Sequence, residues 1–178
     1  MTDAKPPEPY EFSGSISHLL HRVEQLASDR FAELMGDELT LRQFTVLAAV
    51  AANPGLKQAD LVRATGIDRS TLADLIARME KRGWVDRTTS LLDARALSVH
   101  LSASGKALLT STTQQARAAD AAVLDALPRT KRKSFLNTLT KLAKLAAAKA
   151  AKSAREAKRK AKHESHGKAR ARGRRAST

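Results

Sequence analysis

The stretch TGIDRSTLADLIARMEKRGWVDR, residues 65–87, decides the fold of this 178-residue chain. Asp68 is a good N-cap, and the helix that follows it is expected to run to Gly83. Its apolar residues form one stripe at helical spacing: Leu72, Leu75, Ile76 and Met79. The opposite face carries polar and charged side chains: Arg69, Ser70, Thr71, Asp74 and Arg78. A DNA recognition helix needs this division, because one face packs on its domain while the other presents side chains to base edges in the major groove.

The residues on both sides of this helix complete a winged helix-turn-helix. A short helix over about residues 57–65 is predicted to precede it, with Ala59, Leu61 and Val62 inward and Gly66 in the C′ position of the turn. After Gly83 the spacing of apolar residues changes from the helical repeat of 3.6 residues to the strand repeat of 2. This change predicts a hairpin in which residues 84–87 pair with a strand around residues 97–101. The polar stretch 89–95 is the expected loop of this wing.

Further helices are predicted on both sides of the winged domain. One covers residues 15–35, and another begins at Thr40, where Gln43 completes a capping box. Two more are expected over residues 102–127 and about 130–148, separated by Pro128. Residues 1–14 indicate a disordered arm, because Pro6, Pro7 and Pro9 block a helix.

Three motifs of the chain resemble the MarR family. Residues 65–87 are similar to its recognition helix and first wing strand. The DAR sequence at 93–95 resembles its wing-tip Asp-x-Arg, and VHLSASGKALL at 99–109 resembles its second wing strand and the following helix. The match spans roughly residues 15–145 and is tight over 58–109.

The resemblance implies a fold that is mainly α, with a small β-hairpin wing, and an obligate homodimer. Residues 15–148 would form the domain, with a winged helix-turn-helix at 40–101. Residues 15–35 and 102–148 would form a helical dimerisation layer, and a small-molecule pocket would lie between the layers. Apolar stripes support the dimer, because a lone winged domain cannot fully bury them: Ile16, Leu19, Leu20, Val23, Phe135, Leu139 and Leu142.

The resemblance also implies roles for single residues. Arg69, Ser70 and Thr71 would meet DNA at the head of the recognition helix. Arg95 would insert into the minor groove, held by Asp93, and Arg87 would touch a phosphate at the base of the wing. The remaining predicted DNA contacts are Lys57, Gln58, Asp74 and Arg78.

Asp74 stands where many members of that family have Arg. DNA phosphates repel an acidic side chain there unless its carboxylate accepts a hydrogen bond from a cytosine amino group or pairs with Arg78 one turn later. We favour the pair with Arg78, and this departure leaves the operator sequence open.

The charge of the chain is large and uneven. The net charge is +14 and the pI about 10.6, which suggests a polyanionic partner, either nucleic acid or an acidic membrane surface. Residues 147–178 carry twelve Lys and Arg against two Glu, so the remaining 146 residues have a net charge of only +4.

Residues 149–178 therefore form a basic tail, which we expect to be disordered or to become helical on DNA. It is similar in composition to linker-histone tails and is either a solubilising extension or a polycation that binds the DNA backbone without sequence preference. We favour the second interpretation, in which twelve residues make the contacts: Lys149, Lys152, Arg155, Lys158, Arg159, Lys160, Lys162, Lys168, Arg170, Arg172, Arg174 and Arg175.

Several other classes of protein are disfavoured. The chain has no cysteine, and its longest apolar run, 46–52, is too short to span a bilayer, so we expect a cytoplasmic protein associated with the nucleoid. His18 and His21 lie one turn apart without an acidic partner at suitable spacing, so no metal site is predicted. Residues 102–106, SASGK, lack both the leading Gly and the closing Ser or Thr of a phosphate loop. No catalytic constellation is present, and we expect no enzyme and no cofactor.

Two functions follow from these patterns. The first is a repressor that a small molecule releases from a pseudo-palindromic operator. The resemblance implies an aromatic acid, a phenol or an acyl thioester as effector, and nothing in the chain selects among them. The second is a nucleoid architectural protein with little sequence specificity, in which the tail dominates binding.

Overall fold

The computed structural model describes residues 10–90 and 93–175 and is mainly helical, with one small antiparallel sheet. Six helices and three strands follow in the order α1 (Ile16–Met35), α2 (Leu41–Ala52), β1 (Leu56–Lys57), α3 (Gln58–Thr65), α4 (Arg69–Lys81), β2 (Val85–Ser90), β3 (Asp93–Leu101), α5 (Ala103–Asp125) and α6 (Arg129–Arg175). The expected fold class, a winged helix-turn-helix with additional helices, is confirmed.

The winged domain is built on an aliphatic core. Apolar residues of α2, α3, α4 and the sheet are almost completely buried: Val46, Leu47, Val50, Leu61, Leu72, Leu75, Ile76, Met79, Val85 and Val99. The predicted stripe of α4 is therefore its inward face. Thr40 and Gln43 form the predicted capping box at the start of α2, with the Thr40 amide donating to Gln43 Oε1 at 2.9 Å.

The sheet differs from the sequence prediction in two ways. It has a third strand, β1, which pairs with β3 through Leu56 and Val99, so the sheet order is β1-β3-β2. The wing strands also extend further than expected: β2 continues to Ser90 and β3 begins at Asp93, so most of the predicted loop 89–95 is strand. The residues of this stretch that lie in the strands are mostly polar, and a polar strand can pair at a solvated edge.

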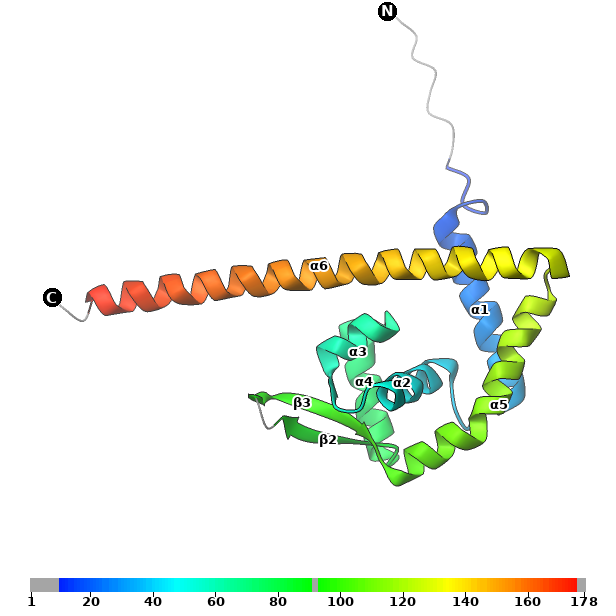
Figure 1. Ribbon diagram of the computed structural model, residues 1–178, viewed down its shortest axis with the longest axis horizontal. Coiled ribbons are helices and arrows are strands. Elements are labelled where there is room, and N and C mark those ends of the chain that lie inside the picture. The colour runs from blue at the N-terminus through cyan, green and yellow to red at the C-terminus, as the bar shows by residue number, and fades with distance from the viewer. Residues whose placement is uncertain (1–9, 91–92, 176–178) are drawn as a thin grey trace, which may run out of the picture.

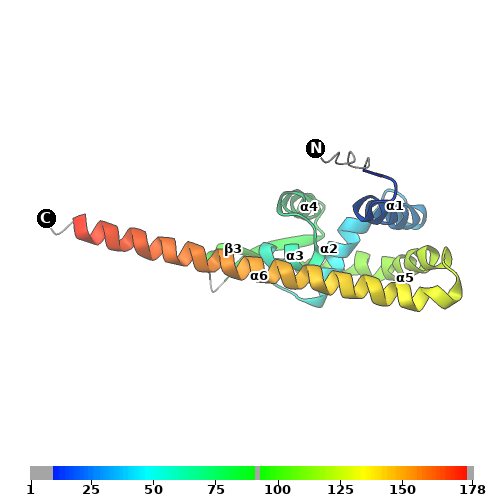
Figure 2. The ribbon, with the colours of Figure 1, turned by 90° about the horizontal axis from the view of Figure 1, so that it is seen from above.

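Helices α1 and α5 lie beside the winged domain, at the right of Figure 1, and α6 runs above it (Figures 1 and 2). Helices α1 and α5 pack together, with Phe31 of α1 and Ala116 and Ala119 of α5 buried. After the turn at Pro128, α6 crosses α3 and projects beyond the wing in both views. The helix has no break near residue 148, where we expected the last domain helix to end. The division into a domain, 15–148, and a tail, 149–178, stays a prediction.

Candidate DNA interface

The turn between α3 and α4 fixes the head of the recognition helix. Gly66 caps α3 in the left-handed conformation, with φ of 73°, and its amide donates to the Val62 carbonyl. Thr65 Oγ1 donates to the Leu61 carbonyl at 2.7 Å and accepts from the Ile67 amide at 3.3 Å. The backbone groups of this turn are therefore satisfied locally, which holds α4 in one orientation against α3.

Asp68 caps α4 as predicted. Its carboxylate accepts from the Thr71 amide at 2.9 Å and from Ser70 Oγ at 2.7 Å. Hydrogen bonds from Thr71, and then from Ser70, hold the pKa of Asp68 well below its ordinary value. Asp68 therefore stays ionised at the positive end of the α4 dipole at every physiological pH.

The residues predicted to read DNA are arranged along α4. Arg69, Ser70, Asp74 and Arg78 are exposed on one side of the helix, whereas Thr71 is half-buried. Thr71 also lines the cavities between α4 and its neighbours, so it faces the protein more than the head-of-helix prediction implied. Among the described residues no hydrogen bond or ion pair joins Asp74 to Arg78, and the interpretation of Asp74 as a partner of Arg78 stays a prediction. Its carboxylate is exposed.

Arg87 at the base of the wing has a protein partner. Its Nε donates to Glu80 Oε2 at 2.7 Å, and the two side chains form an ion pair. This hydrogen bond lowers the pKa of Glu80 and raises the pKa of Arg87. Because the pair joins the end of α4 to β2, Arg87 also positions the wing, and its predicted phosphate contact would have to share the guanidinium with Glu80.

The remaining predicted contacts lie at the edges of this surface. Lys57 ends β1, Gln58 begins α3, and both are half-buried. Asp93 and Arg95 belong to the start of β3, but their side chains fall outside the described residues, as do those of Lys158, Lys160 and all tail cations from Lys162 onward. Lys149, Lys152, Arg155 and Arg159 are exposed on α6.

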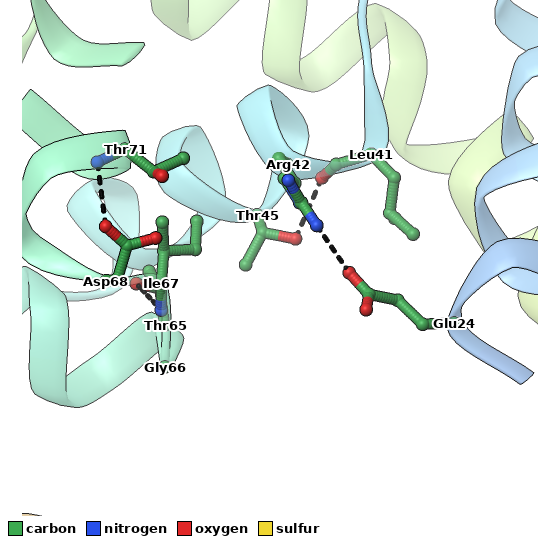
Figure 3. A pocket seen from close by; sticks show the side chains of 9 residues that line it. All are labelled: Glu24, Leu41, Arg42, Thr45, Thr65, Gly66, Ile67, Asp68 and Thr71. Carbon is green, nitrogen blue, oxygen red and sulfur yellow. Dashed lines mark hydrogen bonds and ion pairs between the residues drawn. The ribbon is translucent and has the colours of Figure 1, made fainter. Parts of the chain in front are cut away.

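Two cavities separate α1 from the helix-turn-helix, and both are lined by Arg42, which was not predicted from the sequence. The first, of about 490 Å³, lies between α1, the start of α2 and the turn at Gly66 (Figure 3). Arg42 Nη2 donates to Glu24 Oε1 across it at 2.9 Å, while Asp68 and Thr71 line its other side. The second, of about 470 Å³, is lined by Phe31 of α1 and by Leu75 and Arg78 of α4, and it shares Arg42 with the first. Contacts between residues so distant in sequence leave no local pattern, so they could not be predicted.

Neither a cluster of metal ligands nor a membrane-spanning helix is present in the described part of the chain. No group of three or more His, Cys, Asp or Glu residues there could hold a metal ion. Within residues 10–90 and 93–175, no helix is long and apolar enough to cross a membrane.

Comparison with known proteins agrees with this geometry. The sequence model of the MarR family matches residues 38–96. Transcriptional regulator HosA of Escherichia coli is 31% identical over 118 residues, which are 65% of this chain and 87% of HosA. The transcriptional repressor Rv2887 of Mycobacterium tuberculosis is 33% identical over 121 residues, which are 67% of this chain and 87% of the repressor.

Solved structures share the architecture. BpsR of Bordetella bronchiseptica, whose DNA binding is regulated by 6-hydroxynicotinic acid, aligns with a TM-score of 0.69 and 29% identity over 75% of this chain and 96% of BpsR. The repressor CouR bound to a 23-mer DNA duplex aligns with a TM-score of 0.66 and 27% identity, over 75% and 95% of the two chains. Rv2887 in complex with p-aminosalicylic acid aligns with a TM-score of 0.57 and 29% identity, over 72% and 98%.

Proposed function

Because this chain belongs to the MarR family of DNA-binding transcription regulators, we propose that it is a ligand-responsive repressor. It binds a pseudo-palindromic operator as a homodimer and leaves the operator when a small aromatic acid binds between α1 and the winged domain. It acts on DNA in the cytoplasm, and its basic C-terminal segment adds affinity for the DNA backbone. The observation that carries this proposal is the exposed polar face of α4, with Arg69 and Ser70 at a helix head fixed by Asp68.

The homodimer is supported by apolar side chains that one chain leaves in solvent. Ile16 of α1 is 76% exposed, and Leu145 of α6 is 68% exposed. Others on the same two helices are about half exposed: Leu19, Leu20, Leu136 and Leu142. Large apolar side chains left exposed on two helices indicate an interaction site. A second copy that covers these helices would place two recognition helices on successive half-sites of one operator.

The effector site is supported by the cavities and by the relatives. BpsR responds to 6-hydroxynicotinic acid, and Rv2887 has been solved with p-aminosalicylic acid. Both ligands are aromatic carboxylic acids. The second cavity offers such a ligand the ring of Phe31, the side chain of Leu75 and two guanidinium groups, Arg42 and Arg78. Because its walls belong to α1 and α4, a ligand that fills it acts directly on the position of the recognition helix.

The test compares DNA fragments and variants. Full-length protein is titrated onto its own promoter region and onto random duplex at physiological salt, with footprinting to locate a palindrome. A specific regulator binds its site at least about 10³-fold more tightly than random DNA. Arg69→Ala should lose much of this preference, whereas Arg129→Ala, an exposed Arg at the start of α6, should keep it. Nearly equal affinities of the unaltered protein for its promoter region and for random duplex would instead favour an architectural protein.

The effector is tested in the same assay with 6-hydroxynicotinic acid and p-aminosalicylic acid as probes. We expect at least one aromatic acid of this size to weaken operator binding in the unaltered protein. Arg42→Ala should bind the operator normally without the acid and respond less to it. If no aromatic acid changes operator affinity while the preference for the operator is intact, the effector part of the proposal is wrong and the regulator part stands.

A further inference from the structure

Arg42 lies between the two cavities that separate α1 from the helix-turn-helix. It is the second residue of α2 and lines both cavities, together with Leu41 and Thr71. Its guanidinium faces Glu24 of α1, and Nη2 donates to Glu24 Oε1 at 2.9 Å (Figure 3). In this position the guanidinium is bound by a carboxylate that belongs to the protein itself.

The second cavity contains another guanidinium, that of Arg78 on α4. Within the described part of the chain Arg78 has no ion-pair partner, whereas Arg42 is held by Glu24. Asp29 and Asp37 also line this cavity, so its two guanidinium groups are balanced by two carboxylates. An acid therefore gains most where it contacts a guanidinium directly. It finds one of the two guanidinium groups free and the other occupied.

The bond between Glu24 and Arg42 is of a kind that a ligand can displace. The two side chains are 51% and 59% exposed, and an ion pair so open to water is weak and is screened by salt. An aromatic acid carries the same carboxylate as Glu24 and can make the same charge-assisted hydrogen bonds. Its ring can also be buried against Phe31 and Leu75 of the second cavity, which the Glu24 side chain cannot do. The guanidinium therefore passes from Glu24 to the acid as the concentration of the acid rises.

We propose that Glu24 is an internal competitor of the effector: its carboxylate occupies Arg42 and thereby sets the concentration of aromatic acid at which the effector site fills. This inference rests on the proposed function and deepens it, because it names a residue that tunes the response. It also specifies the chemistry of the ligand. A ligand must carry an anionic group to replace Glu24 on Arg42, and a neutral analogue leaves the ion pair in place.

Two substitutions of the same type on α1 test the competition. Glu24→Gln removes the carboxylate that holds Arg42. Glu33→Gln removes an exposed carboxylate that pairs with Arg30 on the same helix and lines neither cavity. Calorimetric titration of the full-length proteins without DNA measures the binding of 6-hydroxynicotinic acid and p-aminosalicylic acid.

We expect Glu24→Gln to bind at least one of these acids about two- to fivefold more tightly than the unaltered protein, since an exposed ion pair contributes up to about a factor of five. Glu33→Gln should bind it with the affinity of the unaltered protein. Equal affinities of the two variants for both acids would overturn the proposal.

The amide of the first acid, 6-hydroxynicotinamide, separates competition from a change in the shape of the site. It has no carboxylate, so it should bind more weakly than the acid and equally weakly to Glu24→Gln and to the unaltered protein. If Glu24→Gln strengthened the binding of acid and amide by the same factor, the substitution would have altered the cavity rather than freed Arg42. The proposal would then be wrong.

A double substitution tests whether Glu24 acts through Arg42. In a protein that already carries Arg42→Gln, the further change Glu24→Gln should leave the affinity for the acid unchanged, because no guanidinium remains to be freed. If Glu24→Gln strengthened binding there by the same factor as in the unaltered protein, Glu24 would act by direct repulsion of the acid. That result would contradict the competition for Arg42.

These outcomes are separable from those of the proposed function. If an acid binds more tightly to Glu24→Gln but changes operator affinity in neither protein, the competitor stands and the effector part of the proposed function is wrong. If the acid releases the operator from Glu24→Gln and Glu33→Gln at the same concentration, only the competitor is wrong. If neither acid binds to any of these proteins, both are wrong.

Discussion

A methyl group on the Cα of Gly105 would lie 1.9 Å from the carbonyl oxygen of Trp84. The first turn of α5 therefore packs directly on the backbone between α4 and β2. Ser102 Oγ and Ser104 Oγ both donate to the Gly83 carbonyl at 2.5 Å, and the Ser102 amide donates to the Trp84 carbonyl at 3.1 Å. The junction of recognition helix and wing is thus fixed by the start of α5.

Gly105→Ala should destabilise the protein, although alanine favours a helix. Overpacking typically costs about 1–3 kcal/mol, and we expect a value in the upper part of that range because the clash is with backbone. Chemical denaturation measures the free energy of unfolding. Ala107→Gly, at an exposed position of the same turn, should cost only about 1 kcal/mol through helix propensity. A Gly105→Ala protein as stable as the original would show that α5 does not approach Trp84 this closely.

Replacement of Asp68 should lower the stability of the protein by an amount that depends on pH in a defined direction. Its pKa is lowered in the folded protein, so its contribution is fully present above the unfolded pKa of about 3.9 and is lost as the pH falls through the folded value. Asp68→Ala should therefore lower the urea midpoint at pH 7, and the deficit should shrink between pH 4 and pH 2. Asp68→Asn should retain most of the midpoint at pH 7, because Asn is an equally good N-cap. A pH-independent deficit for Asp68→Ala would contradict an ionised cap.

The sequence predicted the winged domain well because local signals there agree with tertiary packing. Gly66, Asp68 and the stripe from Leu72 to Met79 each specify a local conformation, and that conformation is compatible with burial of the same face. Strand β1 was not predicted, because two residues are too few to show the alternation of apolar and polar residues that is typical of a strand. Leu56 belongs to the sheet through its pairing with Val99 of β3. The end of α6 was also misplaced, because Ala and Lys favour a helix on either side of residue 148.

The candidate interface was less predictable than the fold. Its cap and its exposed Arg69 and Ser70 follow from helical periodicity. Two pairings could not be derived that way: Arg87 with Glu80 depends on the path of the chain between α4 and β2, and Arg42 with Glu24 joins two helices. The expected pair of Asp74 and Arg78 suits the spacing of a helix, but both side chains are exposed and gain little from such a contact, so the pair stays a prediction.

Arg95 remains the residue expected to enter the minor groove from the wing. Arg95→Ala should weaken operator binding by roughly 1–3 kcal/mol and leave the dimer and its Tm unchanged. Fluorescence anisotropy with an operator duplex measures the affinity, and thermal unfolding measures the Tm. The same change at Arg117, an exposed residue of α5, serves as control. Unaltered affinity in Arg95→Ala would mean that this wing does not touch DNA.

Sedimentation of the protein at micromolar concentration should show a homodimer. Leu142 is 50% exposed in one chain and belongs to the apolar surface that a second copy would cover. Leu142→Glu should shift the protein towards monomer, because a buried charge without a partner is costly. Thr140→Glu, at an exposed position of the same helix, should remain dimeric. A folded monomer of the unaltered protein at that concentration would refute the dimer.

Deletion of residues 149–178 should separate affinity from specificity. It removes the twelve tail cations and leaves every residue of α3, α4 and the wing in place. Each phosphate contact contributes about 0.9 to the salt slope on duplex DNA, so the slope should flatten by several units if the tail follows the backbone. Operator and random DNA should weaken by similar factors, and their ratio should stay the same or rise. The measurement is a salt titration of full-length and truncated protein on both duplexes.

The two ways in which this last prediction can fail have different meanings. Equal slopes for full-length and truncated protein would show that the tail does not contact DNA and only increases solubility. A loss of operator preference on truncation would place sequence reading in the tail. That segment contains Lys and Arg among Ala, Ser and Gly, without the fixed turn and cap that orient Arg69 on α4. Direct readout needs side chains held in register with base edges, whereas cations along a backbone need no register. Truncation should therefore change the salt dependence and preserve the choice of sequence.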